Sequence, residues 1–374
     1  MDTSETTLTY RRLGPDAPVG LLAGACLELH PRGVTCARCL EACPMEVLHL
    51  TEKGMELGDG CLGCGRCMAV CPTGAIAVHG FSLALTPEST MQSLVIDCWK
   101  VPGIHSPPGA VRVPCLGGLS VSQLLALRYV AGSRELALLD RGLCGKCEAG
   151  GGDAHPAATV LSAARAWLDE IGAPATHWPT LMENPLPDSS QRPRISDDAE
   201  PGTSVSRCDF ESRLAREVST TASEVTGFHL KDNRKGKPVR AVKNPAPVRA
   251  VERERQRLIL DRLAARYGGS LPDSFFPTVE IGPECRGHKL CASLCPTGAL
   301  HHRENPHGGG VAFESAGCIA CGQCERSCPE HALRLSIRAA SARPQDKSME
   351  QIRNVRDTCM DCDGSCTPDG RATR

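Results

Sequence analysis

The cysteine residues of this sequence recur at intervals that suit metal ligands. Two segments follow the spacing C-x2-C-x2-C-x3-C-P without exception, namely Cys61, Cys64, Cys67 and Cys71 in CLGCGRCMAVCP and Cys318, Cys321, Cys324 and Cys328 in CIACGQCERSCP. A [4Fe–4S] cluster takes one thiolate per iron, and at this spacing three cysteines surround one cluster while the fourth, before the proline, binds a second. Structural zinc is the weaker alternative, because zinc sites favour paired C-x-x-C units. Disulfide bonds are disfavoured, because the intervals are too short for several simultaneous bridges.

Each complete motif has an incomplete copy upstream. The incomplete copies contain Cys36, Cys39 and Cys43 in the first half of the chain and Cys285, Cys291 and Cys295 in the second. In the first, Gly33 takes the place of the expected first cysteine, and Cys26, seven residues earlier, either completes the site or leaves it with three thiolates. In the second, His288 takes the place of the expected second cysteine. His288 either binds iron through its imidazole or only lines a site that holds a three-iron cluster or an open corner.

These motifs give two parts of the chain a family resemblance. Residues 33–80 and 283–337 each resemble the bacterial two-[4Fe–4S] ferredoxin domain, and the near-identical segments CPTGAI (71–76) and CPTGAL (295–300) fit that repetition. The resemblance implies two ferredoxin-like domains, which we assign to residues 26–80 and 278–338, with about four [4Fe–4S] clusters. One of the four becomes a [3Fe–4S] cluster if His288 is not a ligand. Gly63, Gly65 and Gly322 between the cysteines would let the backbone wrap closely around a cluster.

Residues 91–173 have the pattern of a small α/β domain. Strands are expected at 93–98, 110–115 and 135–140, and helices at 120–132 and 155–173. Strands that alternate with helices predict a parallel sheet. Four further cysteines stand just past the strand ends, where such sheets place their ligands: Cys98, Cys115, Cys144 and Cys147. From the residues alone, these four are metal ligands for iron or zinc, or free thiols.

This stretch resembles the small iron–sulfur subunit that links hydrogenase to heterodisulfide reductase in methanogens. The likeness lies in a strand, the segment VPCLGGLS, a helix, a second strand and a C-x-x-C-type loop. The resemblance implies one [2Fe–2S] cluster held by Cys98, Cys115, Cys144 and Cys147, and a hydrogenase- or dehydrogenase-type redox partner.

The remaining segments carry weaker signals. Residues 178–270 are expected to form a linker with helices, because 184–204 is rich in Pro, Ser and Asp and 251–269 has a helical pattern that ends at two glycines. The tail, residues 345–374, contains Cys359, Cys362 and Cys366, which complete a site elsewhere, bind zinc or touch a partner. The expected fold class is therefore α+β: two ferredoxin-like domains, a small α/β domain with a parallel sheet between them, and a long irregular linker.

Charge and composition narrow the function. The 42 basic and 43 acidic residues nearly cancel, so we expect no nucleic-acid partner. No segment approaches the roughly 20 apolar residues of a membrane span. Aromatic residues are scarce, which leaves few side chains for large apolar cores and suggests that metal organises the cysteine-rich parts. We expect a cytoplasmic protein, although Arg11-Arg12 before a short apolar run leaves an export signal as the less favoured alternative.

No segment matches a nucleotide-binding loop or a metalloprotease motif. The sequence therefore favours an electron-transfer protein that relays electrons between a redox-enzyme partner and an acceptor, with the two ferredoxin-like domains as the ends and the middle domain between them. The alternative is an accessory, maturation or redox-sensing iron–sulfur protein that uses one labile cluster. A catalytic subunit whose substrate binds an open cluster corner is a third interpretation.

Overall fold

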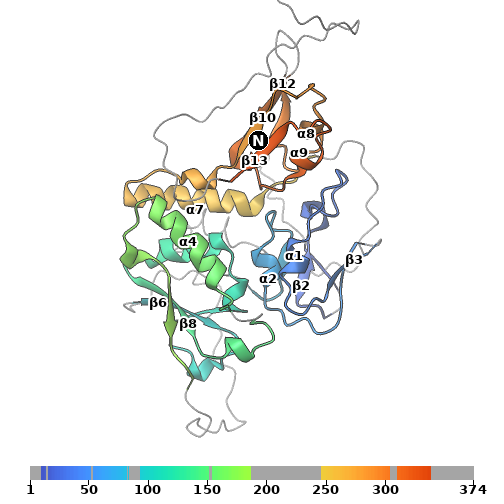
Figure 1. Cartoon of the computed structure of the whole chain (residues 1–374). Coiled ribbons are helices and arrows are strands. Elements are labelled where there is room, and N and C mark those ends of the chain that lie inside the picture. Colours follow the sequence, from blue (N-terminus) through green and yellow to red (C-terminus); the bar gives the residue numbers. More distant parts are fainter. Residues whose placement is uncertain are drawn as a thin grey trace, which may run out of the picture.

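The chain forms three units that surround one long helix, α7 (Figure 1). The computed structural model describes residues 10–13, 16–51, 54–81, 83, 93–150, 154–186, 246–303 and 310–337. We call residues 10–81 the N-terminal unit, residues 93–186 the middle unit and residues 278–337 the C-terminal unit. The tail cysteines Cys359, Cys362 and Cys366 and most of the expected linker lie outside the described residues.

The N-terminal unit is built from a three-stranded antiparallel sheet and a two-stranded antiparallel sheet, with two one-turn helices between the strands. Its elements are β1 (Arg11–Arg12), β2 (Val19–Leu21), α1 (Arg38–Glu41), β3 (Leu48–Thr51), β4 (Gly54–Leu57), α2 (Arg66–Ala69) and β5 (Ile76–Val78). The strand orders are β1-β2-β5 and β3-β4, and every pairing is antiparallel. Gly65 precedes α2 with a φ of 79°, a backbone conformation that favours glycine.

The C-terminal unit repeats the element order from β2 to β5 and has no counterpart of β1 among its described residues. It consists of β10 (Thr278–Ile281), α8 (Leu290–Ser293), β11 (Leu300–Arg303), β12 (Gly310–Phe313), α9 (Gln323–Arg326) and β13 (Leu333–Ser336). β10 pairs antiparallel with β13, and β11 pairs antiparallel with β12, as β2 with β5 and β3 with β4. Gly322 precedes α9 with a φ of 70°, which corresponds to Gly65 before α2. Apart from β1, the two units therefore share one topology.

The middle unit contains the expected parallel sheet. Its elements are β6 (Ser93–Cys98), β7 (Val111–Val113), α3 (Val121–Ala131), β8 (Glu135–Asp140), α4 (Ala158–Glu170) and β9 (Thr180–Glu183). The strand order is β7-β6-β8-β9 and every pairing is parallel. Ser120 and Gln123 form a capping box that fixes the start of α3. β9 corrects the sequence prediction, which placed these four residues in the linker.

Helix α7 (Val251–Tyr267) lies where the sequence predicts a helix, but it is not part of a linker. Ile259, Leu260 and Leu263 are buried in the apolar core of the middle unit, beside α3 and Phe275. Glu252, at the start of α7, accepts a hydrogen bond of 2.9 Å from the Ser122 hydroxyl. Because these contacts join residues more than a hundred positions apart, local pattern could not reveal them.

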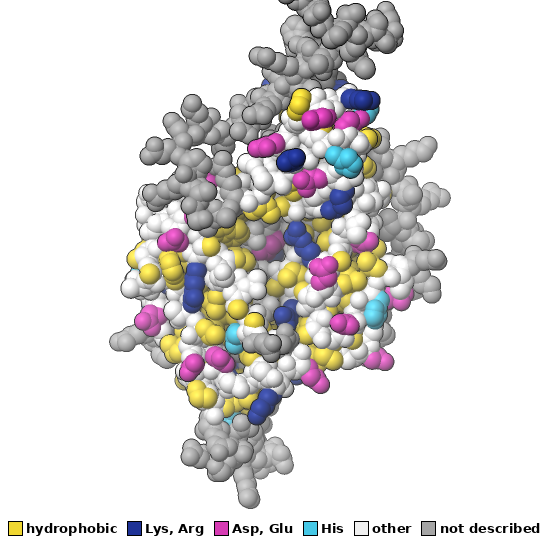
Figure 2. Space-filling view, in the orientation of Figure 1, with side chains coloured by type: hydrophobic (Ala, Val, Ile, Leu, Met, Phe, Trp, Pro, Cys, Tyr) yellow, Lys and Arg dark blue, Asp and Glu magenta, His cyan; other side chains and the backbone are white. Residues whose placement is uncertain are grey.

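None of the described helices is both long and apolar enough to span a bilayer. On the face shown in Figure 2, acidic and basic side chains are interspersed with hydrophobic ones and form no extended patch of one sign. This distribution agrees with a net charge of −1.

Candidate iron–sulfur sites

The cysteines of the N-terminal unit gather in two sets of four. Site 1 is formed by Cys26, Cys36, Cys39 and Cys71, and site 2 is formed by Cys43, Cys61, Cys64 and Cys67. Burial, followed by the charges of Cys71, Cys26 and Cys36, raises the pKa of the Cys39 thiol to about 12, which shows that the four thiols of site 1 are close together. All four cysteines of site 2 line one cavity of about 360 Å³ between β2, β3 and α2.

The two sets exchange their last cysteines. Cys71 ends the second motif and lies in site 1, whereas Cys43 ends the first motif and lies in site 2. This exchange is the arrangement expected for the residue before the proline of each motif. Cys26, which the sequence left open, lies with site 1, where its pKa is raised by burial and also by Cys71 and Cys36. The loop that follows β2 (Val19–Leu21) brings Cys26 there.

The C-terminal unit has a corresponding pair of sites. Site 3 is formed by Cys295, Cys318, Cys321 and Cys324, which line a cavity of about 330 Å³. Site 4 contains three cysteines: Cys285, Cys291 and Cys328. Burial raises the pKa of Cys291, and Cys285 and Cys328 raise it further. Cys295 and Cys328 have exchanged places between motifs, just as Cys43 and Cys71 have.

Site 4 differs from the others at two positions that touch each other. His288 stands where the complete motifs have a cysteine, and its Nδ1 lies 3.1 Å from the carboxylate of Glu330. Glu330 stands two residues after Cys328, the position that is threonine after Cys71 and Cys295. Its carboxylate lies 4.0 Å from the Cys328 sulfur. Sequence reasoning missed Glu330, although the change from CPTGA to CPEHA was a visible signal.

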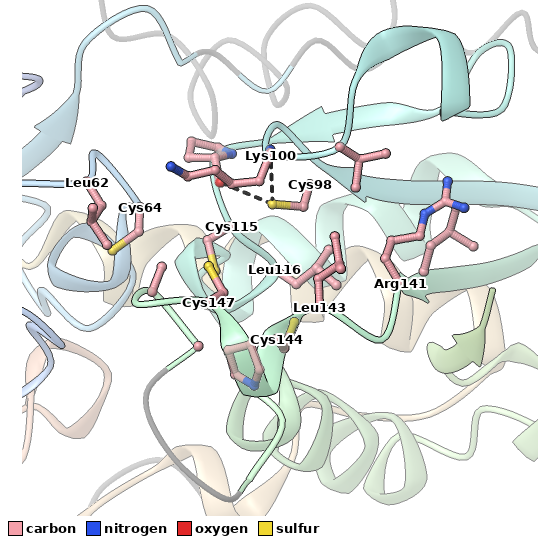
Figure 3. Close-up of a pocket in the computed structure, with 16 residues that line it drawn as sticks. Leu62, Cys64, Cys98, Lys100, Cys115, Leu116, Arg141, Leu143, Cys144 and Cys147 are labelled. Atoms are coloured by element: carbon pink, nitrogen blue, oxygen red, sulfur yellow. Dashed lines mark hydrogen bonds between the residues drawn. The ribbon is translucent and has the colours of Figure 1, made fainter. Parts of the chain in front are cut away.

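The middle unit brings its four cysteines together at one edge of the sheet. Cys98 ends β6, Cys115 follows β7, and Cys144 and Cys147 bracket the short helical turn after β8. These four, which we call site M, line a cavity of about 560 Å³ (Figure 3). Leu62 and Cys64 of the N-terminal unit border the same cavity in Figure 3.

A buried ion pair holds the strand end that carries Cys98. Asp97 is fully buried, and its carboxylate accepts a hydrogen bond of 2.7 Å from the Arg141 guanidinium and one of 2.8 Å from the Ser106 hydroxyl. Burial alone would raise the pKa of Asp97, but the bonds from Arg141 and Ser106 bring that pKa below its usual value. The Cys98 backbone N–H also donates to Asp97, at 2.9 Å. Asp97 therefore fixes the backbone from which Cys98 projects.

A second polar group lies beside Cys144. It consists of Asp140, Cys144 and His155. Each of these side chains has one atom that could bind a metal, and the three atoms lie within 4.8 Å of one another. The Ala157 backbone N–H donates to Nδ1 of His155, so the proton of the neutral imidazole is on Nε2. Nε2 lies 3.6 Å from the Cys144 sulfur, and burial lowers the His155 pKa, which favours this neutral form. His155 is thus placed to donate to sulfur rather than to bind a metal. No signal in the sequence marked it.

The surroundings of the thiols fit iron–sulfur clusters. Backbone N–H groups donate to cysteine sulfurs in several sites: Ala75 to Cys71 at 3.2 Å, Ala332 to Cys328 at 3.3 Å, Leu300 to Cys295 at 3.4 Å and Ala320 to Cys318 at 3.4 Å. Such N–H···S bonds stabilise thiolates and tune cluster potentials. Burial nevertheless raises the pKa of several thiols in these sites, such as Cys318 and Cys324, and the pKa of Cys324 reaches about 12. A buried set of four thiolates would therefore need a positively charged group between them, and a metal centre would supply that charge.

Comparison with known proteins supports this chemistry for part of the chain. A family model described as a 4Fe–4S dicluster domain matches residues 34–75. Neither the curated proteins nor the solved structures gave a match. The matched segment holds seven of the eight cysteines of sites 1 and 2 and omits Cys26. Residues 34–75 therefore form an iron–sulfur domain of the ferredoxin type.

Proposed function

We propose that this protein is a multi-site iron–sulfur electron-transfer protein. Sites 1, 2, 3 and 4 would hold [4Fe–4S] clusters, and site M would hold a [2Fe–2S] cluster. The observation that carries the proposal is the exchange of the final cysteines in both units, since this exchange is the arrangement of the two-cluster ferredoxins. The C-terminal unit is assigned to that class because it repeats the element order of the N-terminal unit.

The chain supplies the environment that such chemistry requires. When bound, an iron–sulfur cluster accepts and returns one electron with its potential set by burial and by hydrogen bonds to sulfur. The cysteines provide thiolates, the N–H donors hold those sulfurs in place, and the apolar neighbours exclude water. All nineteen cysteines in the described part of the chain are free thiols, which supports a reducing compartment such as the cytoplasm.

The partner follows from the middle unit. Its resemblance to the subunit that links hydrogenase to heterodisulfide reductase supports a hydrogenase- or dehydrogenase-type electron donor or acceptor. Electrons would then pass between that enzyme and a second redox protein. In this role the chain is a subunit or carrier of an oxidoreductase system.

Site 4 favours a second candidate function, a redox sensor or accessory protein. Site 4 has only three cysteines, and the His288 side chain is 48% exposed. An exposed corner without a thiolate is where a cluster loses iron most readily. Purified protein would distinguish the two functions, because a sensor loses one cluster in air while the others remain, whereas a carrier is reduced and reoxidised reversibly at every site.

We assign His288 as the fourth ligand of site 4. The Glu330 carboxylate can only accept, so Nδ1 of His288 donates and Nε2 carries the lone pair that binds metal. A carboxylate that orients a histidine in this way is common around protein metal sites. His155 has the opposite tautomer, which is why only His288 is assigned to a metal.

The assignment predicts the iron content of His288 variants. Anaerobically assembled His288→Ala should lose about one iron per chain and show the spectrum of an oxidised [3Fe–4S] cluster. His288→Cys should keep all the iron and lower the potential of site 4, because thiolate favours the oxidised state more than imidazole does. His301→Ala, an exposed histidine in the same unit, is the control. Unchanged iron and an unchanged spectrum in His288→Ala would show that His288 only lines the site.

The electron-transfer proposal also predicts the total metal content. Four [4Fe–4S] clusters and one [2Fe–2S] cluster give about eighteen iron atoms per chain, with a matching amount of acid-labile sulfide. Iron and sulfide assays on anaerobically purified protein, followed by a dithionite titration, test this number and its reversibility. About sixteen iron atoms with one zinc would assign zinc to site M. A colourless, folded protein without iron would contradict the proposal.

A further inference from the structure

The five sites form contacts that do not follow the order of the chain. The first contact joins site 2 to site M through Cys64, which lines the cavity of each. Burial raises the pKa of Cys115 to about 11, and the charge of Cys64 contributes. Site M in the middle unit and site 2 in the N-terminal unit are therefore immediate neighbours.

Close backbone packing maintains this first contact. A Cβ added to Gly118 would overlap the backbone carbonyl oxygen of Cys64, so the two segments approach as closely as they do only because residue 118 lacks a side chain. The Arg66 guanidinium, next to site 2, donates to the carbonyls of Ala149 and Gly150 at 3.1 and 3.2 Å. Ala149 and Gly150 follow Cys147 of site M, and Arg66 lies between Cys64 and Cys67 of site 2. Both sides of the contact therefore carry cysteines of the sites.

Sites 1 and 2 are joined within the N-terminal unit. Cys39 of site 1 is among the groups that, after burial, raise the pKa of Cys67 in site 2. Cys26, Cys39, Cys67 and Cys71 also share one buried core. The exchanged cysteines thus place the two sites side by side.

The next contact joins site 1 to site 3 through a shared apolar group. Cys36 and Cys321 both pack against one buried apolar group. That group contains Leu27, Val34, Val248, Ala250 and Ile319. Two arginines reinforce the contact, since Arg32 donates to the Cys295 carbonyl and Arg38 donates to the Ile319 carbonyl at 3.4 Å. The N-terminal and C-terminal units therefore meet at their cysteine loops.

Helix α7 separates the C-terminal unit from the middle unit. It packs on α3 on one side and contacts the turn Ser315–Gly317 of the C-terminal unit on the other. Figure 1 shows α7 between α4 and the strands of the C-terminal unit. Sites 3 and 4 share one buried core within that unit, with Cys285, Cys291 and Cys328 from site 4.

From these contacts we infer that the sites lie in the spatial order M, 2, 1, 3, 4. The middle of the sequence is thus one end of the array, and site 4 is the other. This order rests on the proposed electron-transfer function and replaces the sequence-based expectation that the middle domain connects the two ferredoxin-like domains.

One electron from a one-electron donor enters at one end, and one electron leaves to a one-electron acceptor at the other, with no bond made or broken. The apolar group against which Cys36 and Cys321 both pack is the crossing point between the two halves.

Magnetic coupling between reduced neighbouring sites tests the order in the full-length holoprotein. Dithionite-reduced protein is measured by electron paramagnetic resonance, with Cys291→Ala and Cys324→Ala identifying the signals of sites 4 and 3. Loss of site M, in the Cys115→Ser/Cys144→Ser variant, should narrow the signal of site 2 and leave the signals of sites 3 and 4 unchanged. Loss of site 1, in Cys39→Ala, should reduce the coupling seen at both site 2 and site 3, while site 2 stays coupled to site M and site 3 stays coupled to site 4.

A variant that keeps every cysteine provides the second measurement. Gly118→Ala should retain wild-type iron and weaken the coupling between site M and site 2, whereas Gly103→Ala, in a similar turn of the same unit with open space around it, should not. Altered signals of sites 3 and 4 after loss of site M, with site 2 unchanged, would overturn the order. Failure of the proposed function is distinguishable, because the wild-type protein would then lack iron or reversible reduction.

Discussion

Replacing Cys71 with alanine is expected to remove about four iron atoms per chain, the content of one [4Fe–4S] cluster. Cys71 is buried at 8% exposure and reaches from the second motif into site 1, so its loss opens site 1 and also breaks the link between the two halves of the N-terminal unit. Iron per chain and hydrogen exchange of residues 10–81 measure the two effects. Because the core of this unit is lined with cysteine, exchange should rise throughout the unit.

Val70→Ala is the matched control for Cys71→Ala. Val70 is the preceding residue in the same motif and its side chain is 39% exposed, so its truncation should leave iron content and exchange unchanged. Full iron content in Cys71→Ala would show that site 1 does not depend on the exchanged cysteine. That result would contradict the dicluster arrangement assigned to the N-terminal unit.

Replacing Asp97 with alanine is expected to destabilise the middle unit by about 3–5 kcal/mol, because the buried Arg141 guanidinium keeps its hydrogen bonds to Asn184 and His105 but loses the carboxylate that balances its charge. The strand end that carries Cys98 loses its anchor as well, so iron bound at site M should fall. Denaturant unfolding of the anaerobic holoprotein, followed by tryptophan fluorescence, reports this change, because all three tryptophans lie in the middle unit.

Two further variants make the Asp97 result specific. Asp169→Ala removes an exposed carboxylate from α4 and should change the free energy of unfolding by no more than about 0.5 kcal/mol. Asp97→Ala combined with Arg141→Met removes both charges and should recover part of the lost stability. Equal stability of Asp97→Ala and the wild type would show that the ion pair contributes nothing to the fold.

Local patterns predicted much of the middle unit. The expected strands at 93–98 and 135–140 match β6 and β8, and the helix expected at 120–132 matches α3, Val121–Ala131. Alternation of strands and helices was enough to predict a parallel sheet, because the connection between two parallel strands must cross over the sheet and is usually a helix. The four cysteines of site M were found for the same reason, since they follow strand ends.

Contacts between distant segments were not predictable in this way. Thr180–Glu183 is too short to show a strand pattern. It forms β9 only because its backbone pairs with the free edge of β8. The role of α7 depends on packing against α3, from which it is separated by a long stretch of chain. His155 and Glu330 owe their positions to the backbone around Cys144 and Cys328, and no spacing rule marks a hydrogen-bond partner of a thiol.

The apolar interior formed by β6, β8, α3 and α7 has a consequence for how the protein is made. This interior is built from aliphatic and aromatic side chains, so it needs no metal to fold. It is nevertheless incomplete until Ile259, Leu260 and Leu263 have left the ribosome. We therefore expect the nascent chain to fold this scaffold late and without iron. The N-terminal unit is translated first. It would therefore bind its clusters beside a middle unit that had not yet folded when the N-terminal unit left the ribosome.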